Sequence, residues 1–164
     1  MDSDEWQSGD LLGDGETGDD TPTNSKIGWI VFDLGSVQTL DELYIWHVRE
    51  NAGRVATDFN VYVASTPTVS LTNGPTGGNS IDYDFSSGGW STVATGLVGT
   101  HQGSSVVDLS GNSGQYIGLE MIANGGDSQR VGFAEVGITA VPEPSVFVLI
   151  GLAGMALLAR RRRA

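Results

Sequence analysis

The chain has 164 residues, among them 24 glycines and no cysteine, and its formal net charge is −12. This length suits one domain with one hydrophobic core, and a charged fraction of 17% excludes a charge-driven disordered chain. Residues 1–140 carry 19 acidic and 4 basic side chains, whereas residues 141–164 carry one glutamate and four arginines. An acidic body offers no cationic face to phosphates, so the composition argues against a nucleic-acid partner.

Residues 1–25 form an acidic leader with eight acids and no base. The segment lacks the positively charged start, apolar stretch and cleavage site of a secretory signal peptide. We therefore expect that the true N-terminus of the protein is missing from this sequence. One interpretation is a solvated acidic segment. The other is a calcium loop in Gly13-Asp-Gly-Glu-Thr-Gly-Asp-Asp-Thr21, where glycines let carboxylate and carbonyl oxygens converge on a hard cation.

From residue 27 onward the pattern is that of β-strands. Ile27-Gly-Trp-Ile-Val-Phe-Asp-Leu34 alternates with period two, and Gly35-Ser36 is predicted to end this strand. Further strands are expected over residues 40–48, 58–64, 81–85, 90–97, 104–109, 115–122 and 131–139, each bounded by turn residues. No helical pattern of ten residues precedes the tail. The sequence therefore predicts an all-β domain over residues 26–140, built as an antiparallel β-sandwich.

The order of these strand sequences carries a resemblance. The segments are Trp29-Ile-Val-Phe-Asp-Leu-Gly35, Leu43-Tyr-Ile-Trp46, Arg54 before Phe59-Asn-Val-Tyr-Val63, Trp90, Gln115-Tyr-Ile-Gly-Leu119 and Phe133-Ala-Glu-Val136. As an ordered set they resemble the discoidin domain, also called F5/8 type C or galactose-binding-like, although the opening strand before Gly13 is missing. The resemblance implies an eight-stranded jelly roll whose loops at one end commonly bind carbohydrate, lipid headgroups or protein.

The same resemblance implies a structural Ca²⁺ as cofactor. In this family the ion is commonly held by an early Asp-Gly loop and by a glutamate of the final strand. Matched residue by residue, this predicts Asp14 and Asp19 in the first loop, together with Glu135 and the carbonyl of Ala134.

The candidate ligand site is the loop His47-Val-Arg-Glu-Asn-Ala-Gly-Arg54 between two predicted strands. The planar polar groups of His47, Arg49, Asn51 and Arg54 offer the forked donors and acceptors that vicinal sugar hydroxyls need. The competing interpretation is that Arg49 is solvated and Arg54 makes a structural bond within the sandwich. No nucleophilic, metal-hydrolytic or paired-carboxylate constellation stands out, so we expect no enzyme activity from the body.

The tail, residues 141–164, has three parts: Val141-Pro142-Glu143-Pro144, an apolar stretch, and Arg160, Arg161, Arg162 and Arg163. A helix over 145–159 is predicted as a transmembrane segment, although its fourteen apolar residues span only about 21 Å, short of the ~30 Å hydrocarbon core. Prolines 142 and 144 stop this helix upstream, and the arginines favour the cytoplasmic side. The orientation places residues 1–140 outside the inner membrane.

This order of Pro-Glu-Pro, one apolar helix and an arginine cluster resembles the PEP-CTERM sorting signal of Gram-negative bacteria. The resemblance implies an exosortase as partner, transient anchoring in the inner membrane, and release or transfer to the cell surface or extracellular matrix in bacteria that make exopolysaccharide.

Two functions of different classes follow. The first is a surface-displayed module that binds a polysaccharide or another surface glycan. The second is a structural or cohesion protein of the matrix that binds nothing small. A third interpretation, an accessory domain from a larger glycoside hydrolase, requires additional N-terminal sequence.

Overall fold

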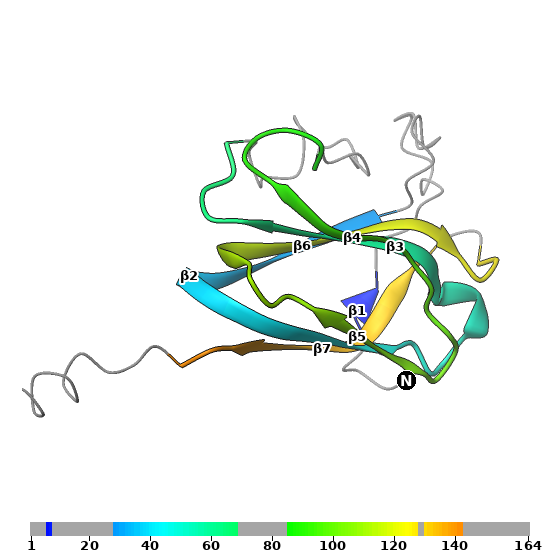
Figure 1. Cartoon of the computed structure of the whole chain (residues 1–164). Helices are drawn as coiled ribbons and strands as arrows, with labels where there is room; N and C mark the ends of the chain where they lie inside the picture. The colour runs from blue at the N-terminus through cyan, green and yellow to red at the C-terminus, as the bar shows by residue number, and fades with distance from the viewer. Residues whose placement is uncertain (1–5, 8–27, 69–84, 128–129, 143–164) are drawn as a thin grey trace, which may run out of the picture.

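The computed structural model describes residues 6–7, 28–68, 85–127 and 130–142, which form a two-layered β-sandwich (Figure 1). The strands are β1 (Trp6–Gln7), β2 (Gly28–His47), β3 (Ala56–Ala64), β4 (Ser91–Leu97), β5 (Ser104–Asp108), β6 (Ser113–Asn124) and β7 (Gly132–Ala140), with a 3₁₀ turn, η1 (Ala52–Arg54), after β2. All pairings between these strands are antiparallel. The predicted all-β antiparallel sandwich is therefore confirmed.

Strand β2 belongs to both layers because it bends in its middle. Residues 28–39 pair with β6 and residues 40–47 pair with β7, and the β6 pairing shifts register between Asp33 and Gln38. Gly35 lies inside this shift at φ +78°, a conformation that glycine adopts without steric cost, and its N–H donates to Asp33 Oδ1 at 2.8 Å. The prediction that a strand ends at Gly35-Ser36 was wrong, because the chain bends there and continues into the other layer.

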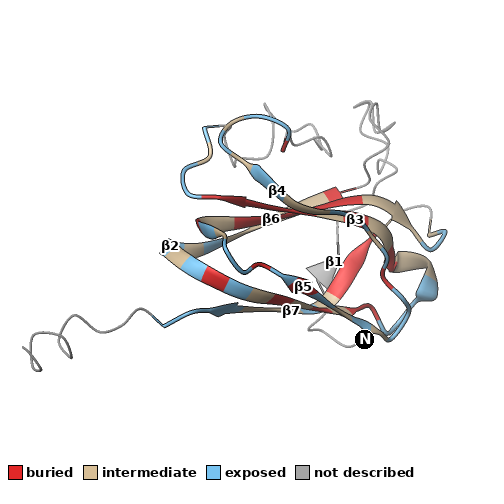
Figure 2. Ribbon diagram, viewed as in Figure 1, coloured by how far each residue is buried: buried red, intermediate tan, exposed pale blue. Residues whose placement is uncertain are grey.

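We call the two layers sheet A and sheet B. Sheet A has the order β1, β7, β2 and β5, and sheet B has the order β2, β6, β3 and β4. Sheet A is the lower layer in Figure 1, and the second half of β2 runs through its middle. Figure 2 shows buried positions along both layers where they face each other.

The core fills the space between the sheets with alternate side chains of each strand, as period-two patterns predict. Leu43 and Ile45 of sheet A are fully buried, and Phe59 of sheet B meets Phe133 of sheet A edge-on, with ring centroids 5.8 Å apart. The buried cluster consists of Leu40, Leu43, Ile45, Ala56, Phe59, Val61, Val63, Val107, Leu109, Ile117, Leu119, Met121, Val131 and Phe133.

A second apolar cluster covers the outer face of sheet B. Phe85, in the connection between β3 and β4, is 1% exposed, and its ring stacks on Tyr62 with centroids 4.7 Å apart. Gly118 of β6 lies directly beneath, since a Cβ there would come within 2.2 Å of Phe85 Cε1. The Tyr62 hydroxyl donates to Glu120 Oε2 at 2.7 Å. Burial raises the pKa of Tyr62 to about 12, and the hydrogen bond to Glu120 makes the second-largest contribution to this shift. The outer face of sheet B is therefore largely occupied.

Two predicted elements cannot be compared with the structure. Residues 81–84 of the expected strand 81–85 lie outside the described residues, and Phe85 belongs to a turn. The predicted transmembrane helix over 145–159 also lies outside them. In the part of the chain that the structure describes, no helix has the length and apolar character needed to cross a membrane.

Candidate functional site

Three connections meet at one end of the sandwich, which we call the loop end (right in Figure 1). They are residues 48–55 after β2, residues 98–103 after β4 and residues 125–131 after β6. Backbone hydrogen bonds join them: Asp127 N donates to Gly53 O at 3.0 Å, and Gln102 N donates to Val48 O at 3.3 Å. The loop end is thus one connected surface rather than three independent loops.

The first of these connections is shaped by Asn51, which caps the 3₁₀ turn η1. Its backbone is extended, and its side-chain Oδ1 accepts from Gly53 N at 2.8 Å, as capping asparagines do. Gly53 is tightly enclosed, because a Cβ there would approach Asp127 N to 3.0 Å. The Asn-Ala-Gly-Arg sequence therefore sets the path of the loop and places Arg54 at its end.

The carboxylate of Asp127 accepts hydrogen bonds from the connection after β2 and from its own connection after β6. We call this group the Asp127 clasp. Oδ2 accepts from Arg54 Nε at 3.0 Å and from Asn51 Nδ2 at 3.3 Å. Oδ1 accepts from Arg130 N at 3.0 Å, and Asn124 Nδ2 donates to the Asp127 carbonyl at 2.6 Å. The side chains of Arg54 and Asp127 are only 24% and 12% exposed, so this ion pair is partly desolvated.

His47, the last residue of β2, lies in the core and not on the loop surface. It is 1% exposed, and its ring meets Phe59 and Phe133 at centroid distances of 6.0 and 6.2 Å. Nε2 lies 2.8 Å from Ser105 Oγ, and Gly99 leaves room beside Nδ1, where a Cβ would come within 2.6 Å. Burial disfavours the charged imidazolium and lowers the pKa of His47.

The four predicted ligand residues therefore occupy three environments. Arg49 and Asn51 are exposed, Arg54 is held in the Asp127 clasp, and His47 is in the interior. The Arg49 carbonyl lies 2.9 Å from His101 Nε2, which ties the loop to the β4–β5 connection. The structure brings Asn51 and Arg54 together and excludes His47 from the surface group; that the group binds a ligand stays a prediction.

Sequence reasoning missed Asp127 as the residue that organises this end. The available signal was Asn124-Gly-Gly-Asp127, a turn with an acid, in a body that contains few basic side chains. A half-buried arginine needs an acidic partner, but the sequence alone offered 19 acids in residues 1–140. Only the fold shows which of them lies beside Arg54.

The predicted calcium ligands fall into two groups. Asp14 and Asp19 lie outside the described residues. Ala134 is half-buried and Glu135 is exposed on β7, where Glu135 pairs with Trp46 of β2. Within the described ranges no three His, Cys, Asp or Glu side chains come together as a metal site would require. Calcium binding therefore remains a prediction that depends on the first loop.

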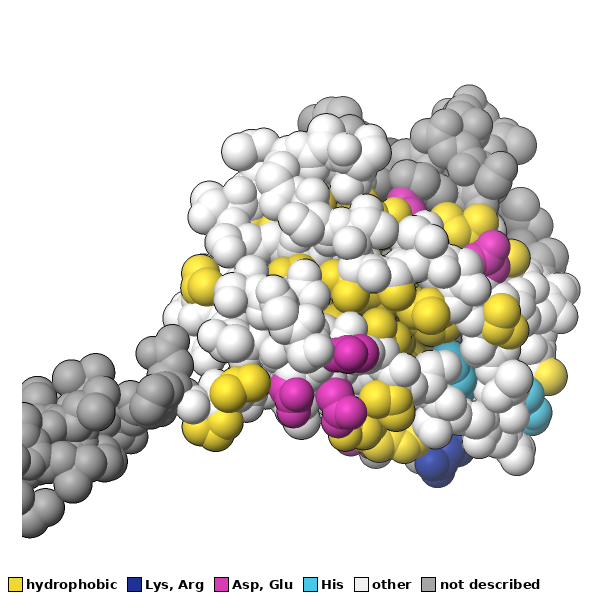
Figure 3. Space-filling model, in the orientation of Figure 1, with side chains coloured by type: hydrophobic (Ala, Val, Ile, Leu, Met, Phe, Trp, Pro, Cys, Tyr) yellow, Lys and Arg dark blue, Asp and Glu magenta, His cyan; other side chains and the backbone are white. Residues whose placement is uncertain are grey.

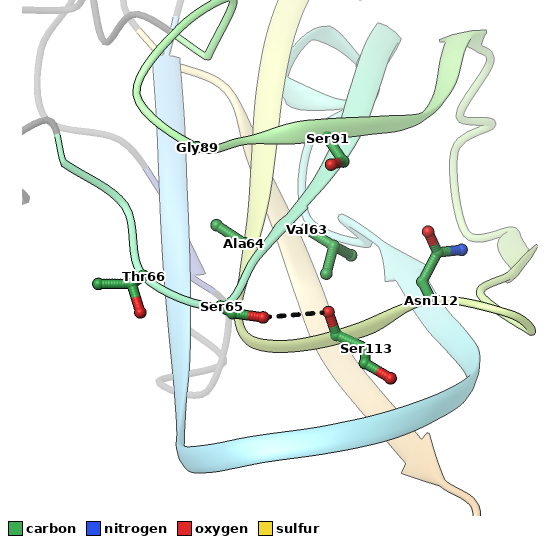
Figure 4. A pocket seen from close by; sticks show the side chains of 8 residues that line it. All are labelled: Val63, Ala64, Ser65, Thr66, Gly89, Ser91, Asn112 and Ser113. Atoms are coloured by element: carbon green, nitrogen blue, oxygen red, sulfur yellow. Dashed lines mark hydrogen bonds between the residues drawn. The ribbon is translucent and has the colours of Figure 1, made fainter.

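A hollow of about 320 Å³ lies where β3 ends and β4 and β6 begin (Figure 4). Ser65 Oγ at its floor donates to the Ser113 carbonyl at 3.4 Å. The lining carries hydroxyls and one amide but no charge and no aromatic ring; it consists of Val63, Ala64, Ser65, Thr66, Gly89, Ser91, Asn112 and Ser113. Without a ring for a sugar to stack on, this hollow is a weaker candidate than the loop end.

The sandwich has the fold of known carbohydrate-binding modules. It is similar to chitosan-binding module 1 from a chitosanase/glucanase of Paenibacillus sp. IK-5, with a TM-score of 0.50 and 17% identity over 83% of this chain and 76% of that one. It is also similar to CBM32-1 from a family 31 glycoside hydrolase of Clostridium perfringens, with a TM-score of 0.50 and 11% identity over 84% and 77% of the two chains. At these identities the likeness establishes the fold alone.

The tail is a PEP-CTERM protein-sorting motif, which a family model matches over residues 140–163. The prediction made from Pro-Glu-Pro and the arginine cluster is confirmed. Such a motif implies export and sorting at a membrane. A comparison with curated proteins found no match to this sequence.

Proposed function

We propose that the sandwich is a carbohydrate-binding module that the PEP-CTERM tail delivers to the cell envelope, where an exosortase processes it and leaves the domain on the cell surface or in the matrix. The proposal assigns no catalysis to the domain. One observation carries it: the chain joins a matched sorting motif to a glycan-module fold. Polysaccharide is the expected partner, with Arg49 and Asn51 at the loop end as the first contacts.

The positions of the two ends of the domain support this reading. The tail leaves after Ala140, at the end of β7, whereas the loop end contacts the start of the same strand through the bridge between Val55 and Gly132. The nine residues of β7 separate these points by about 27 Å. Figure 1 shows the end of β7 and η1 on opposite sides of the sandwich. A tethered domain would therefore direct Arg49 and Asn51 away from its anchor.

A glycan array probed with the full-length chain tests this function. We expect Arg49→Ala to weaken the strongest signals, since it removes an exposed guanidinium without touching the clasp. Glu50→Gln is the matched control, an exposed neighbour in the same loop. Arg54→Ala is a poor choice because it also breaks the bond to Asp127. An array on which the folded protein binds no glycan would refute the carbohydrate-binding function.

The delivery step is tested separately by fractionation in a host with an exosortase. Replacing Pro142, Glu143 and Pro144 together by alanine should leave the uncut chain in the membrane fraction. Normal release of this variant would contradict processing at the motif.

A structural or cohesion role is the second candidate, and one observation favours it. Asn51 and Arg54, two of the groups expected to bind a ligand, already bond to Asp127. The third candidate is an accessory domain of a larger glycoside hydrolase. The two similar structures named above are modules of such enzymes. An upstream coding sequence for a catalytic domain would support it.

A further inference from the structure

The outer face of sheet A presents two aromatic side chains where a sandwich usually exposes polar ones. Tyr44 and Trp46 are neighbours on this face of β2, with ring planes 20° apart and centroids separated by 6.1 Å. Both are half-buried rather than enclosed, in contrast to Phe85 over sheet B.

The two neighbouring strands border the rings with an exposed valine and a glycine. On β5, Val106 lies opposite Tyr44 and is 56% exposed. On β7, Gly137 lies opposite Tyr44, and the Trp46 ring reaches over it, since a Cβ at Gly137 would be 3.4 Å from Trp46 Cζ3. Because Gly137 has no side chain, the indole packs against this position of β7 and stays partly exposed to solvent.

Three carboxylates border this aromatic pair. Glu42 lies on β2, two residues before Tyr44, and accepts a hydrogen bond from the Tyr44 hydroxyl. Asp108 lies directly opposite Glu42 on β5, and Glu135 lies opposite Trp46 on β7. In Figure 3 acidic side chains lie among hydrophobic ones along the lower side of the molecule, which sheet A forms.

Like charges at directly opposed positions of two strands destabilise a sheet. Asp108 is held ionised, because hydrogen bonds from Ser110 lower its pKa. The basic side chains among the described residues are Arg49, Arg54 and Arg130, all of which belong to connections of the loop end and not to sheet A. Within the described residues, this face thus combines aromatic rings with carboxylates and carries no basic side chain, which favours a cation seated on the rings.

We propose that the outer face of sheet A is a second glycan site, which binds a polysaccharide carrying protonated amines across Tyr44 and Trp46, with Glu42, Asp108 and Glu135 on its ammonium groups. Sugar rings pack on the flat aromatic pair, and the carboxylates select the free amine over its acetylated form. This inference rests on the proposed function in taking a glycan as the ligand, but it uses none of the loop-end residues.

Calorimetric titration of the full-length protein with a β-1,4-linked glucosamine hexasaccharide tests the site. We expect measurable binding that weakens with added salt, and an affinity about tenfold lower for the N-acetylated hexasaccharide. Trp46→Ala should lower the affinity about tenfold or more. Glu42→Gln keeps an acceptor for the Tyr44 hydroxyl and removes one of two opposed like charges, so it should lower the affinity severalfold in a protein whose thermal midpoint does not fall. Val37→Ala, an exposed valine in the bend of β2, is the control.

Each other result overturns the inference in a recognisable way. Equal binding of the acetylated hexasaccharide would show that the carboxylates select nothing. Equal binding of hexalysine would show a general response to positive charge. Loss of binding in Arg49→Ala but not in Trp46→Ala would place the site at the loop end and leave the proposed function standing. Only a folded protein that binds no glycan, on the array or in titration, would refute both the proposed function and the second site.

Discussion

Removing the carboxylate of the Asp127 clasp should destabilise the domain more than any other single change at the loop end. In Asp127→Ala, three donors lose their carboxylate acceptor: Arg54 Nε, Asn51 Nδ2 and the backbone N–H of Arg130. Arg54 is only 24% exposed, so water replaces its lost partner incompletely. The two connections that Asp127 joins, after β2 and after β6, should then separate more easily.

The size of the loss follows from these three hydrogen bonds. A bond to a charged group contributes about 1.5–3 kcal/mol when buried. The Asn51 bond is long, at 3.3 Å, and its residue is exposed, and the Arg54 bond is partly screened by solvent. We therefore expect Asp127→Ala to lower the free energy of unfolding by about 2–4 kcal/mol, which corresponds to a fall of roughly 10 °C in the thermal midpoint.

Urea denaturation followed by circular dichroism measures the change, with Arg54→Ala and the double variant completing a mutant cycle. The coupling energy between Arg54 and Asp127 should be about 1–2 kcal/mol. Glu50→Gln is the control, because its carboxylate lies 3.9 Å from Arg54 Nη1, too far for a hydrogen bond; it should change stability by less than about 0.5 kcal/mol. If Asp127→Ala were as mild as Glu50→Gln, the clasp would not hold the loop end together.

Three further predictions concern other parts of the domain. Gly118→Ala should cost about 1–3 kcal/mol because the new methyl group collides with Phe85, whereas Gly137→Ala, with only ordinary contacts, should be nearly neutral in the same denaturation assay. Burial lowers the pKa of His47 in the folded protein, so as the pH falls the unfolded chain takes up the His47 proton before the folded one does. The free energy of unfolding should therefore be constant above about pH 6.5 and decrease below it, by at most about 1.4 kcal/mol per pH unit. His47→Gln should flatten this dependence between pH 5 and 7. Millimolar Ca²⁺ should raise the thermal midpoint of the wild type but not of Asp14→Asn, and an unchanged wild-type midpoint would rule out the structural ion.

Local pattern was sufficient to predict most of the strands but not their partners. The alternation in Ile27 to Leu34 reports a strand half-buried in a sheet, and β2 does begin there. The same pattern predicts that the strand ends at Gly35, because a glycine in the sequence can mark either a turn after a strand or a bend within one. In the structure Gly35 has a positive φ in a bend. Only the register of β6 and β7, which begin 78 and 97 residues after Gly35, decides between a turn and a bend. Long-range pairing is the information that a local pattern lacks.

The candidate site shows the same limit more strongly. The prediction for the 47–54 loop rested on residue types, and residue types do not report burial: His47 ends a strand whose alternate positions face the core, so it packs on Phe59. The alternative of a structural bond for Arg54 agrees with the hydrogen bond to Asp127. Tyr44 and Trp46 show a related limit: the alternation places them on one face of a strand, but only the fold shows that this is the outer face of sheet A.

The strand pairing of sheet A ends where the sorting motif begins. The ladder of β7 continues to Ala140, which pairs with Leu40, and Val141 N still donates to Thr39 O at 2.9 Å. Pro142 has no N–H and could not extend that ladder, so the pairing stops where the Pro-Glu-Pro sequence starts. If an exosortase cuts the chain as proposed, cleavage after Val141 would leave these hydrogen bonds in place. Replacing Pro142 by a residue with an N–H is the change that would allow the ladder to extend toward the cleavage site.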